Sequence, residues 1–314
     1  MNGDNNFYLK ISLLLAAAFG VWIFGAGKKI SGNENASSSV SASTSPAALS
    51  DFAPPALKIF KEPESDFPKR NWSAPFLELK AEAALAMSLD GGRIYYNKNI
   101  ETRRPIASLT KLMTAIIVLE NYDLNRTVKI SAEAVKRESA SGGLRVGENI
   151  AVRSLLSIML IDSSNDAAFA LAEQKKNFIS LMNEKAVEMG LKNTHFSVPD
   201  GLDSDGNYSS ALDIAKIFVY LVEKHSEALE ILKTKNMTVY SVDGKIEHRL
   251  ESTDKLLDAD GDIIAGKTGF TDNAGGCLVL LAKNGIVSVV LGSTDRFGES
   301  QKMIQWLKTA YIWK

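Results

Sequence analysis

Short apolar runs separated by turn residues occur near both ends of the chain beyond residue 75. Each pair of runs is joined by Asp-Gly or Asn-Gly, the dipeptides that favour tight turns between antiparallel strands. Three such pairs are visible: residues 83–97 around Asp90-Gly91-Gly92, residues 239–248 around Asp243-Gly244, and residues 278–291 around Lys283-Asn284-Gly285. The pattern predicts three β-hairpins.

Between these runs the apolar residues recur at helical spacing. Residues 152–232 are mostly of this kind, residues 105–119 form a run of helix formers that begins at Pro105, and residues 299–311 are amphipathic. Strands at both ends with helices between them predict an α/β (α+β) fold, with one antiparallel sheet built from both termini and a helical insertion.

The first 74 residues have a different pattern. Residues 11–27 form an uncharged run. Its length is about the minimum for a membrane-spanning helix and also suits the core of a signal peptide. Positive charges lie on both sides of this run, at Lys10 before it and at Lys28 and Lys29 after it. Their distribution therefore does not predict which end of the run faces the cytoplasm. We expect residues 1–30 to be an uncleaved membrane anchor, with a cleaved signal segment as the alternative.

Residues 31–74 are rich in serine, alanine and proline, a composition that buries too little apolar surface to fold by itself. We therefore expect a tether there and a folded catalytic domain in residues 75–314.

The composition limits the kinds of partner and of metal or cofactor site that we expect. The formal net charge of −1 gives no electrostatic reason to expect a nucleic-acid partner. The single cysteine, Cys277, lies in an apolar run and is expected to be a buried, inert thiol. The three histidines, His195, His225 and His248, are not at ligand spacing, so neither a metal nor another cofactor is expected.

Ser108 and Lys111 are candidates for an acyl-transfer site. Three residues apart on a helix, they share one face near its positively polarised N-terminus. A hydroxyl, an amine able to accept its proton, and backbone donors for an oxyanion are the parts of a serine nucleophile site without histidine. The pair alone is weak evidence, because Ser252 and Lys255 repeat the same spacing and a solvated helix face is the ordinary explanation.

Two further motifs follow in the chain. Ser163-Ser164-Asn165 ends one helical run and precedes another that Asp166 could cap, and Lys267-Thr268-Gly269 ends an apolar strand. Each motif alone is commonly a turn or a cap. In this order, however, the three motifs are the set found in penicillin-binding proteins and class A β-lactamases.

From about residue 83 to residue 307 the chain resembles the serine D-alanyl-D-alanine carboxypeptidases, the low-molecular-weight penicillin-binding proteins. The matching stretches include residues 105–114, 147–148, 159–160, 163–168, 189–196, 199–202 and 266–272. The resemblance implies the β-lactamase/DD-peptidase fold and a lysine whose pKa is lowered by burial beside a second cation, Lys267. It also implies peptidoglycan stem peptides as substrates, β-lactam antibiotics as covalent inhibitors, and a location outside the cytoplasmic membrane, where the N-terminal segment would serve as the anchor.

The resemblance also assigns roles. Ser108 is expected to be the acylated nucleophile, Lys111 its proton acceptor and Ser163 a proton relay. The expected substrate-binding residues are Asn165 for the substrate amide, Lys267 for local positive potential, Thr268 for the terminal carboxylate, and Gly269 and Phe270 beside them. The backbone N–H groups of Ser108 and Phe270 would form the oxyanion hole.

Three positions depart from the family pattern. Ser164 stands where glycine is frequent, Phe270 where histidine or tyrosine is frequent, and Leu212 where many relatives have arginine. Arg296 is a candidate to supply the positive charge that Leu212 lacks.

Three alternatives to a carboxypeptidase remain open. An endopeptidase would cut cross-links, and a non-catalytic module would bind peptidoglycan on the same fold. A class A β-lactamase would need a Glu-x-x-Leu-Asn segment. Residues 188–192 come nearest to that segment but end in Lys192.

Overall fold

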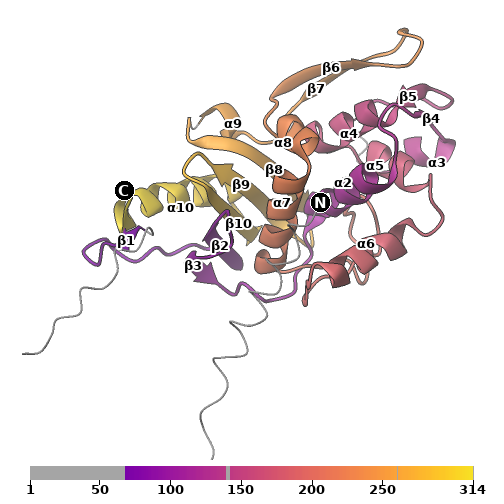
Figure 1. Cartoon of the computed structure of the whole chain (residues 1–314). Helices are drawn as coiled ribbons and strands as arrows, with labels where there is room; N and C mark the ends of the chain where they lie inside the picture. Colours follow the sequence, from indigo (N-terminus) through magenta and orange to yellow (C-terminus); the bar gives the residue numbers. More distant parts are fainter. Residues whose placement is uncertain (1–67, 139–141, 260, 314) are drawn as a thin grey trace, which may run out of the picture. The chain divides into compact units, whose positions relative to one another are not determined.

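The centre of the fold is a five-stranded antiparallel sheet (Figure 1). A computed structural model describes residues 68–138, 142–259 and 261–313. The strands in order across the sheet are β3 (Ile94–Lys98), β2 (Ala83–Ser88), β10 (Ile286–Ser293), β9 (Gly275–Ala282) and β8 (Ile263–Thr271). Because β2 pairs with β10, the prediction of one sheet built from both ends of the domain is confirmed.

Two of the predicted hairpins lie in this sheet. Gly91 in the β2–β3 turn and Gly285 in the β9–β10 turn have φ angles of +71° and +70°, values that glycine adopts without steric cost. The Asn-Gly turn brings Ala282 opposite Ile286. The third predicted hairpin forms a separate two-stranded sheet of β6 (Asn236–Tyr240) and β7 (Glu247–Glu251).

Alternate residues of the central sheet face two different hydrophobic cores. In β2, Ala83, Leu85 and Met87 belong to the larger core, while Ala84 and Ala86 belong to the smaller one. Successive strand residues point to opposite faces, so both faces of this sheet are covered. Helix α10 (Arg296–Ala310) is among the helices that supply the smaller core, and α2 (Thr110–Asn121) and α7 (Ala211–Lys224) are among those that supply the larger.

The remaining helices and strands lie mainly between β3 and β8 in the sequence. They are β4 (Thr127–Lys129), α3 (Ala132–Val135), β5 (Asn149–Ala151), α4 (Val152–Ile161), α5 (Asn165–Ala172), α6 (Phe178–Glu188), α8 (Ser226–Leu232) and α9 (Leu256–Ala259). Figure 1 shows most of them as the magenta and orange helices beside the sheet. The predicted helical insertion is therefore confirmed.

Three local boundaries differ from the sequence prediction. The helix that carries the serine opens with a 3₁₀ turn, η1 (Ala107–Leu109), before α2. The cap of α5 is Ser164, whose side chain accepts a hydrogen bond from Ala167 N, rather than Asp166. Helix α10 starts three residues earlier than predicted because the Asp295 side chain accepts a hydrogen bond from Gly298 N and caps it there.

The N-terminal predictions fall mainly outside the described residues. This holds for residues 1–30 and for most of residues 31–74. Of the latter, residues 68–74 are described and include β1 (Lys69–Arg70), which pairs with β11 (Tyr311–Ile312) near the C-terminus. Contacts divide the chain into residues 1–61 and 62–314, and every described residue belongs to the second unit. Within the described part, no helix combines the length and apolar character that a membrane crossing requires.

Candidate active site

The fold brings the Ser108 hydroxyl and the Lys111 amine together. Ser108 lies in η1 and Lys111 in the first turn of α2. Lys111 Nζ donates a hydrogen bond to Ser108 Oγ over 2.8 Å, so the two side chains share one face as their spacing predicts.

Lys111 is completely buried and has two further hydrogen-bond acceptors. Its Nζ donates to Asn165 Oδ1 and to the backbone carbonyl of Asp200, each over 2.6 Å. As an ammonium group, Lys111 therefore uses all three hydrogens. As a neutral amine it keeps two N–H donors for Asn165 and Asp200, and its lone pair can accept the Ser108 hydroxyl proton.

The three acceptors of Lys111 are all uncharged groups. The Asp200 carboxylate is turned instead to Arg137, whose Nε donates to Asp200 Oδ2 over 2.8 Å. Burial lowers the pKa of Lys111 from 10.5 to about 7, against the opposing charges of Asp200 and Asp166 and with support from Arg137. Burial is thus the main cause, as predicted, and the neighbouring cation that lowers the pKa further is Arg137 rather than the predicted Lys267.

The second motif lies at the junction of α4 and α5. Ser163 has a φ of +61°, an uncommon conformation for a residue with a side chain. Its Oγ accepts a hydrogen bond from Lys267 Nζ over 2.8 Å. Asn165 begins α5 and donates from Nδ2 to the Glu138 carbonyl over 2.8 Å, which orients its oxygen toward Lys111.

The third motif lies on β8, an edge strand of the central sheet. Lys267 and Thr268 are buried, whereas 60% of Phe270 is exposed. Burial and the positive charge of Lys111 lower the pKa of Lys267 well below 10.5. A Cβ at Gly269 would lie 2.9 Å from Ser108 N, so only glycine allows this close approach of β8 to η1.

The three motifs therefore form a closed series of contacts. Lys111 joins the first motif to Asn165 of the second, Ser163 joins the second to Lys267, and Gly269 packs against the backbone of Ser108. The structure brings together every residue that the sequence predicts for the site.

Two groups essential to this geometry have no assigned role in the sequence prediction. One is the Asp200 carbonyl with its partner Arg137, and the other is Gly201, which packs directly on Ala107 O and has a φ of +82°. Residues 199–202 belong to the stretches on which the family resemblance rests. That match was the sequence feature that could have pointed to a role for Asp200 and Gly201. Nothing in the local sequence links them to residue 107, because the link is a tertiary contact.

The second Ser-x-x-Lys copy does not form a pair like the first. Ser252 Oγ accepts a hydrogen bond from Asp254 N, and Lys255 Nζ lies 5.8 Å from the centroid of the Phe297 ring. One residue of this second copy, Thr253, does contact the third motif, because its Oγ1 lies 2.6 Å from Thr268 Oγ1.

Arg296 and Leu212 lie in different environments. The Arg296 guanidinium stacks 5.9 Å from the centroid of the Phe270 ring, next to the third motif. Leu212 packs against the larger core, and its N–H donates to the Ile100 carbonyl. Of the two residues, Arg296 therefore lies near the third motif, beside Phe270.

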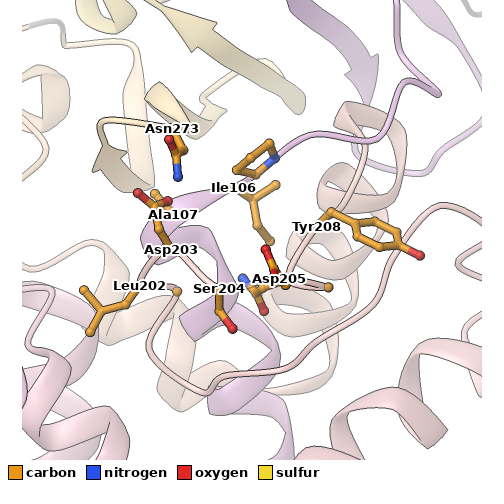
Figure 2. A pocket seen from close by; sticks show the side chains of 12 residues that line it. Ile106, Ala107, Leu202, Asp203, Ser204, Asp205, Tyr208 and Asn273 are labelled. Atoms are coloured by element: carbon orange, nitrogen blue, oxygen red, sulfur yellow. The ribbon is translucent and has the colours of Figure 1, made fainter.

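A hollow with a volume of about 570 Å³ adjoins the nucleophile (Figure 2). It lies between Asn273, in the turn after β8, and the loop of residues 201–208, with Ile106 and Ala107 among its lining residues. Asp203 and Asp205 give it an acidic lining.

The described side chains offer no metal-binding cluster of three or more histidine, cysteine or acidic residues. Cys277 is buried, and burial raises the pKa of its thiol to about 11, which agrees with the predicted inert thiol.

Comparison with known proteins agrees with this geometry. Residues 69–295 match the peptidase S11 family model, described as D-alanyl-D-alanine carboxypeptidase. The chain is 34% identical over 258 residues to D-alanyl-D-alanine carboxypeptidase DacF of Bacillus subtilis, covering 74% of this chain and 63% of that one. It is 31% identical over 248 residues to a D-alanyl-D-alanine endopeptidase of Pseudomonas aeruginosa, covering 75% of this chain and 79% of that one.

The crystal structure of the Streptomyces K15 DD-transpeptidase superposes with a TM-score of 0.69 at 32% identity, covering 73% of this chain and 97% of that one. The predicted β-lactamase/DD-peptidase fold is thereby confirmed. The chain matches less than two thirds of the length of DacF and of the Escherichia coli carboxypeptidase DacA, 63% and 61% respectively. The chain belongs to the D-alanyl-D-alanine carboxypeptidase family.

Gly201 allows a direct test of the packing behind the nucleophile. In Gly201→Ala the new Cβ would lie 2.0 Å from Ala107 O, whereas in Gly206→Ala, at the same φ of +82°, its nearest neighbour would be His195 Nδ1 at 3.5 Å. We expect Gly206→Ala to lower the free energy of unfolding by about 1–2 kcal/mol through backbone strain alone. Gly201→Ala should cost about 2–5 kcal/mol, because overpacking is added to that strain.

Denaturant unfolding of both variants measures the difference. Equal losses would show that residue 201 is not crowded by the nucleophile segment.

Proposed function

Starting from this family membership, we propose that the protein is a serine DD-peptidase that acts on peptidoglycan stem peptides through an acyl-enzyme on Ser108. We further propose that it removes the terminal D-alanine. One observation carries the proposal: a completely buried Lys111 amine, with its pKa lowered to about 7, lies 2.8 Å from the Ser108 hydroxyl. An amine with that pKa is a usable general base at neutral pH.

In the proposed acylation step, neutral Lys111 accepts the Ser108 hydroxyl proton while Oγ attacks the carbonyl carbon of the penultimate D-alanine. The N–H groups of Ser108 and Phe270 stabilise the resulting oxyanion. The C–N bond then breaks, and the departing D-alanine amine receives a proton through Ser163. The hydrogen bond from Lys267 to Ser163 Oγ supports this relay. Water subsequently hydrolyses the acyl-enzyme.

Substrate binding follows from the same elements. An edge strand presents unpaired backbone groups to which an extended peptide can add, and β8 occupies that position. Thr268 donates to the terminal carboxylate, and the buried Lys267 amine and the half-buried Arg296 guanidinium beside Phe270 supply positive potential. Asn165 contacts the substrate amide, and Gly269 keeps β8 close to the nucleophile.

We propose that this activity is located outside the cytoplasmic membrane. Residues 1–30 anchor the chain and the residues from 31 to just before β1 form the tether. The catalytic domain follows and starts earlier than the predicted residue 75, because β1 (Lys69–Arg70) already pairs with β11. The uncharged run of residues 11–27 supports the anchor. No metal or other cofactor takes part in the proposed reaction, and β-lactam antibiotics act as covalent inhibitors.

Two observations support endopeptidase activity on cross-links as a second candidate. The Pseudomonas relative that matches over 79% of its length is named an endopeptidase. In addition, Phe270 places an exposed apolar ring beside Thr268 rather than a polar side chain, which would suit a group larger than a free carboxylate.

Covalent labelling by a fluorescent penicillin tests the nucleophile. Ser108→Ala should abolish labelling because no oxygen remains to form the acyl bond, and Ser252→Ala should label like the wild type. Mass spectrometry of muropeptides incubated with the protein should show loss of one D-alanine. Labelling that persists in Ser108→Ala would exclude this nucleophile, while an unlabelled wild type would favour a non-catalytic module.

The pKa of Lys111 predicts the pH dependence of acylation. Since the base is the neutral amine, the second-order acylation rate should rise with pH, level off above about pH 7, and be about tenfold below its plateau at pH 6. Lys111→Arg, which stays charged, should lose acylation by at least about 100-fold. Lys255→Arg is the matched control and should keep the wild-type profile. A flat profile between pH 6 and 8 would contradict Lys111 as the base.

The carboxylate contacts predict substrate preference. A charge-assisted hydrogen bond contributes about 1.5–3 kcal/mol, so a peptide ending in free D-Ala-D-Ala should have a kcat/KM at least about tenfold above that of its C-terminal amide. The comparison should include a cross-linked dimer. Equal values for the free and amidated peptides, or a preference for the dimer, would replace the carboxypeptidase assignment with the endopeptidase one.

A further inference from the structure

Large apolar side chains are exposed together where the two ends of the described chain meet. Trp72, Phe76 and Ile312 are 81%, 87% and 63% exposed. With Trp306 and Trp313 they form a group that we call the terminal aromatic patch. It contains three of the four tryptophans in the chain, and the fourth, Trp22, lies in the uncharged run of residues 11–27.

Contacts through Arg70 join two members of the patch, Trp72 and Trp306. The Arg70 guanidinium lies over the rings of Trp72, Trp306 and Tyr311, with 5.1–5.6 Å to their centroids. Trp306 Nε1 donates to the Pro75 carbonyl, next to Phe76 in the chain. Pairing of β1 with β11 places Ile312 opposite Lys69.

The patch rests on a rigid base. Trp306 and Trp313 pack against the smaller core, and Tyr311 and Tyr95 meet edge to face with 5.0 Å between ring centroids. Exposed apolar residues gathered on a well-packed surface are unusual in soluble monomers and mark interaction sites.

Cationic side chains accompany these aromatic residues. Lys69 and Arg70 lie on β1, and Lys302 and Lys308 lie on α10. Arg70 and Lys302 donate hydrogen bonds to backbone carbonyls and keep their charge, whereas the charge of Lys308 is paired with Asp262. A tryptophan-rich apolar surface beside lysine and arginine matches the boundary between the acyl chains and headgroups of an anionic bilayer. A two-fold dimer through the same patch would instead bring these cations near their own copies.

The position of the patch also favours a bilayer as its partner. The described chain begins at residue 68, immediately before β1, and the preceding residues 31–67 lead back to the uncharged run. If residues 1–30 are anchored, a tether of this length holds the domain near the surface, where its effective concentration is high. Even a weak affinity then keeps the patch docked.

We propose that the terminal aromatic patch docks on an anionic membrane surface, with Trp72, Phe76 and Ile312 in the interface. This rests on the proposed anchoring of residues 1–30, but not on the activity at Ser108. Docking gives the catalytic domain a fixed orientation relative to the membrane, beyond what a tether alone provides.

The experiment uses the full chain reconstituted into phosphatidylcholine vesicles with and without phosphatidylglycerol. An environment-sensitive fluorophore is attached at Phe76→Cys or at Val187→Cys, a control position on α6 that is 79% exposed. The buried Cys277 should remain unlabelled. Lipids carrying a nitroxide should quench the probe at position 76 at least about twofold more than at 187, and more strongly with phosphatidylglycerol.

A double variant, Trp72→Ser with Ile312→Ser, should reduce quenching at position 76 to the level at 187. Both side chains are exposed, and penicillin labelling of Ser108 checks that the fold is intact. If carbonate extraction releases the chain from vesicles, the anchoring premise fails. Equal quenching at both positions in chains that carbonate does not release would overturn the docking alone, as would cross-linking between two copies at position 76 without lipid.

Discussion

The active-site geometry depends on a lysine amine buried among uncharged acceptors. Burial alone would make the Lys111 ammonium costly, yet the Ser108 hydroxyl, the Asn165 amide and the Asp200 carbonyl satisfy its hydrogens. A carboxylate in direct contact would raise the pKa further. The Asp200 carboxylate, whose charge already opposes the effect of burial, binds Arg137 rather than Lys111. The site thus combines complete hydrogen bonding with easy loss of a proton.

Holding these acceptors around one nitrogen requires backbone conformations that few residues adopt. Ala107 and Ser163 have φ angles of +48° and +61°. Gly201 packs tightly against the backbone of Ala107. Such conformations cost about 1–3 kcal/mol each and persist only where packing stabilises them. The larger core provides that packing, since α2, α4 and α5 all contribute buried residues to it.

The sheet separates the candidate active site from the terminal aromatic patch. Its larger core supports the nucleophile and the second motif, while its edge strand β8 carries the third motif beside them. The smaller core on the opposite face supports α10, β11 and the terminal aromatic patch. A rigid sheet between them relates the orientation of the patch to the position of the active site.

The strands, the helices and the candidate reactive groups can be predicted from the sequence. Apolar periodicity and Asp-Gly or Asn-Gly turns specify strands and helices locally, and the order of the three motifs predicts that Ser108, Lys111, Ser163, Asn165 and Lys267 belong to one site. The surroundings of these residues follow from the tertiary structure. The roles of Asp200, Arg137 and Thr253, and the aromatic patch formed by both ends of the domain, depend on contacts between residues far apart in the chain, which no local pattern encodes. The lowered pKa of Lys111 likewise arises from burial, which exists only once the helices and the sheet have packed.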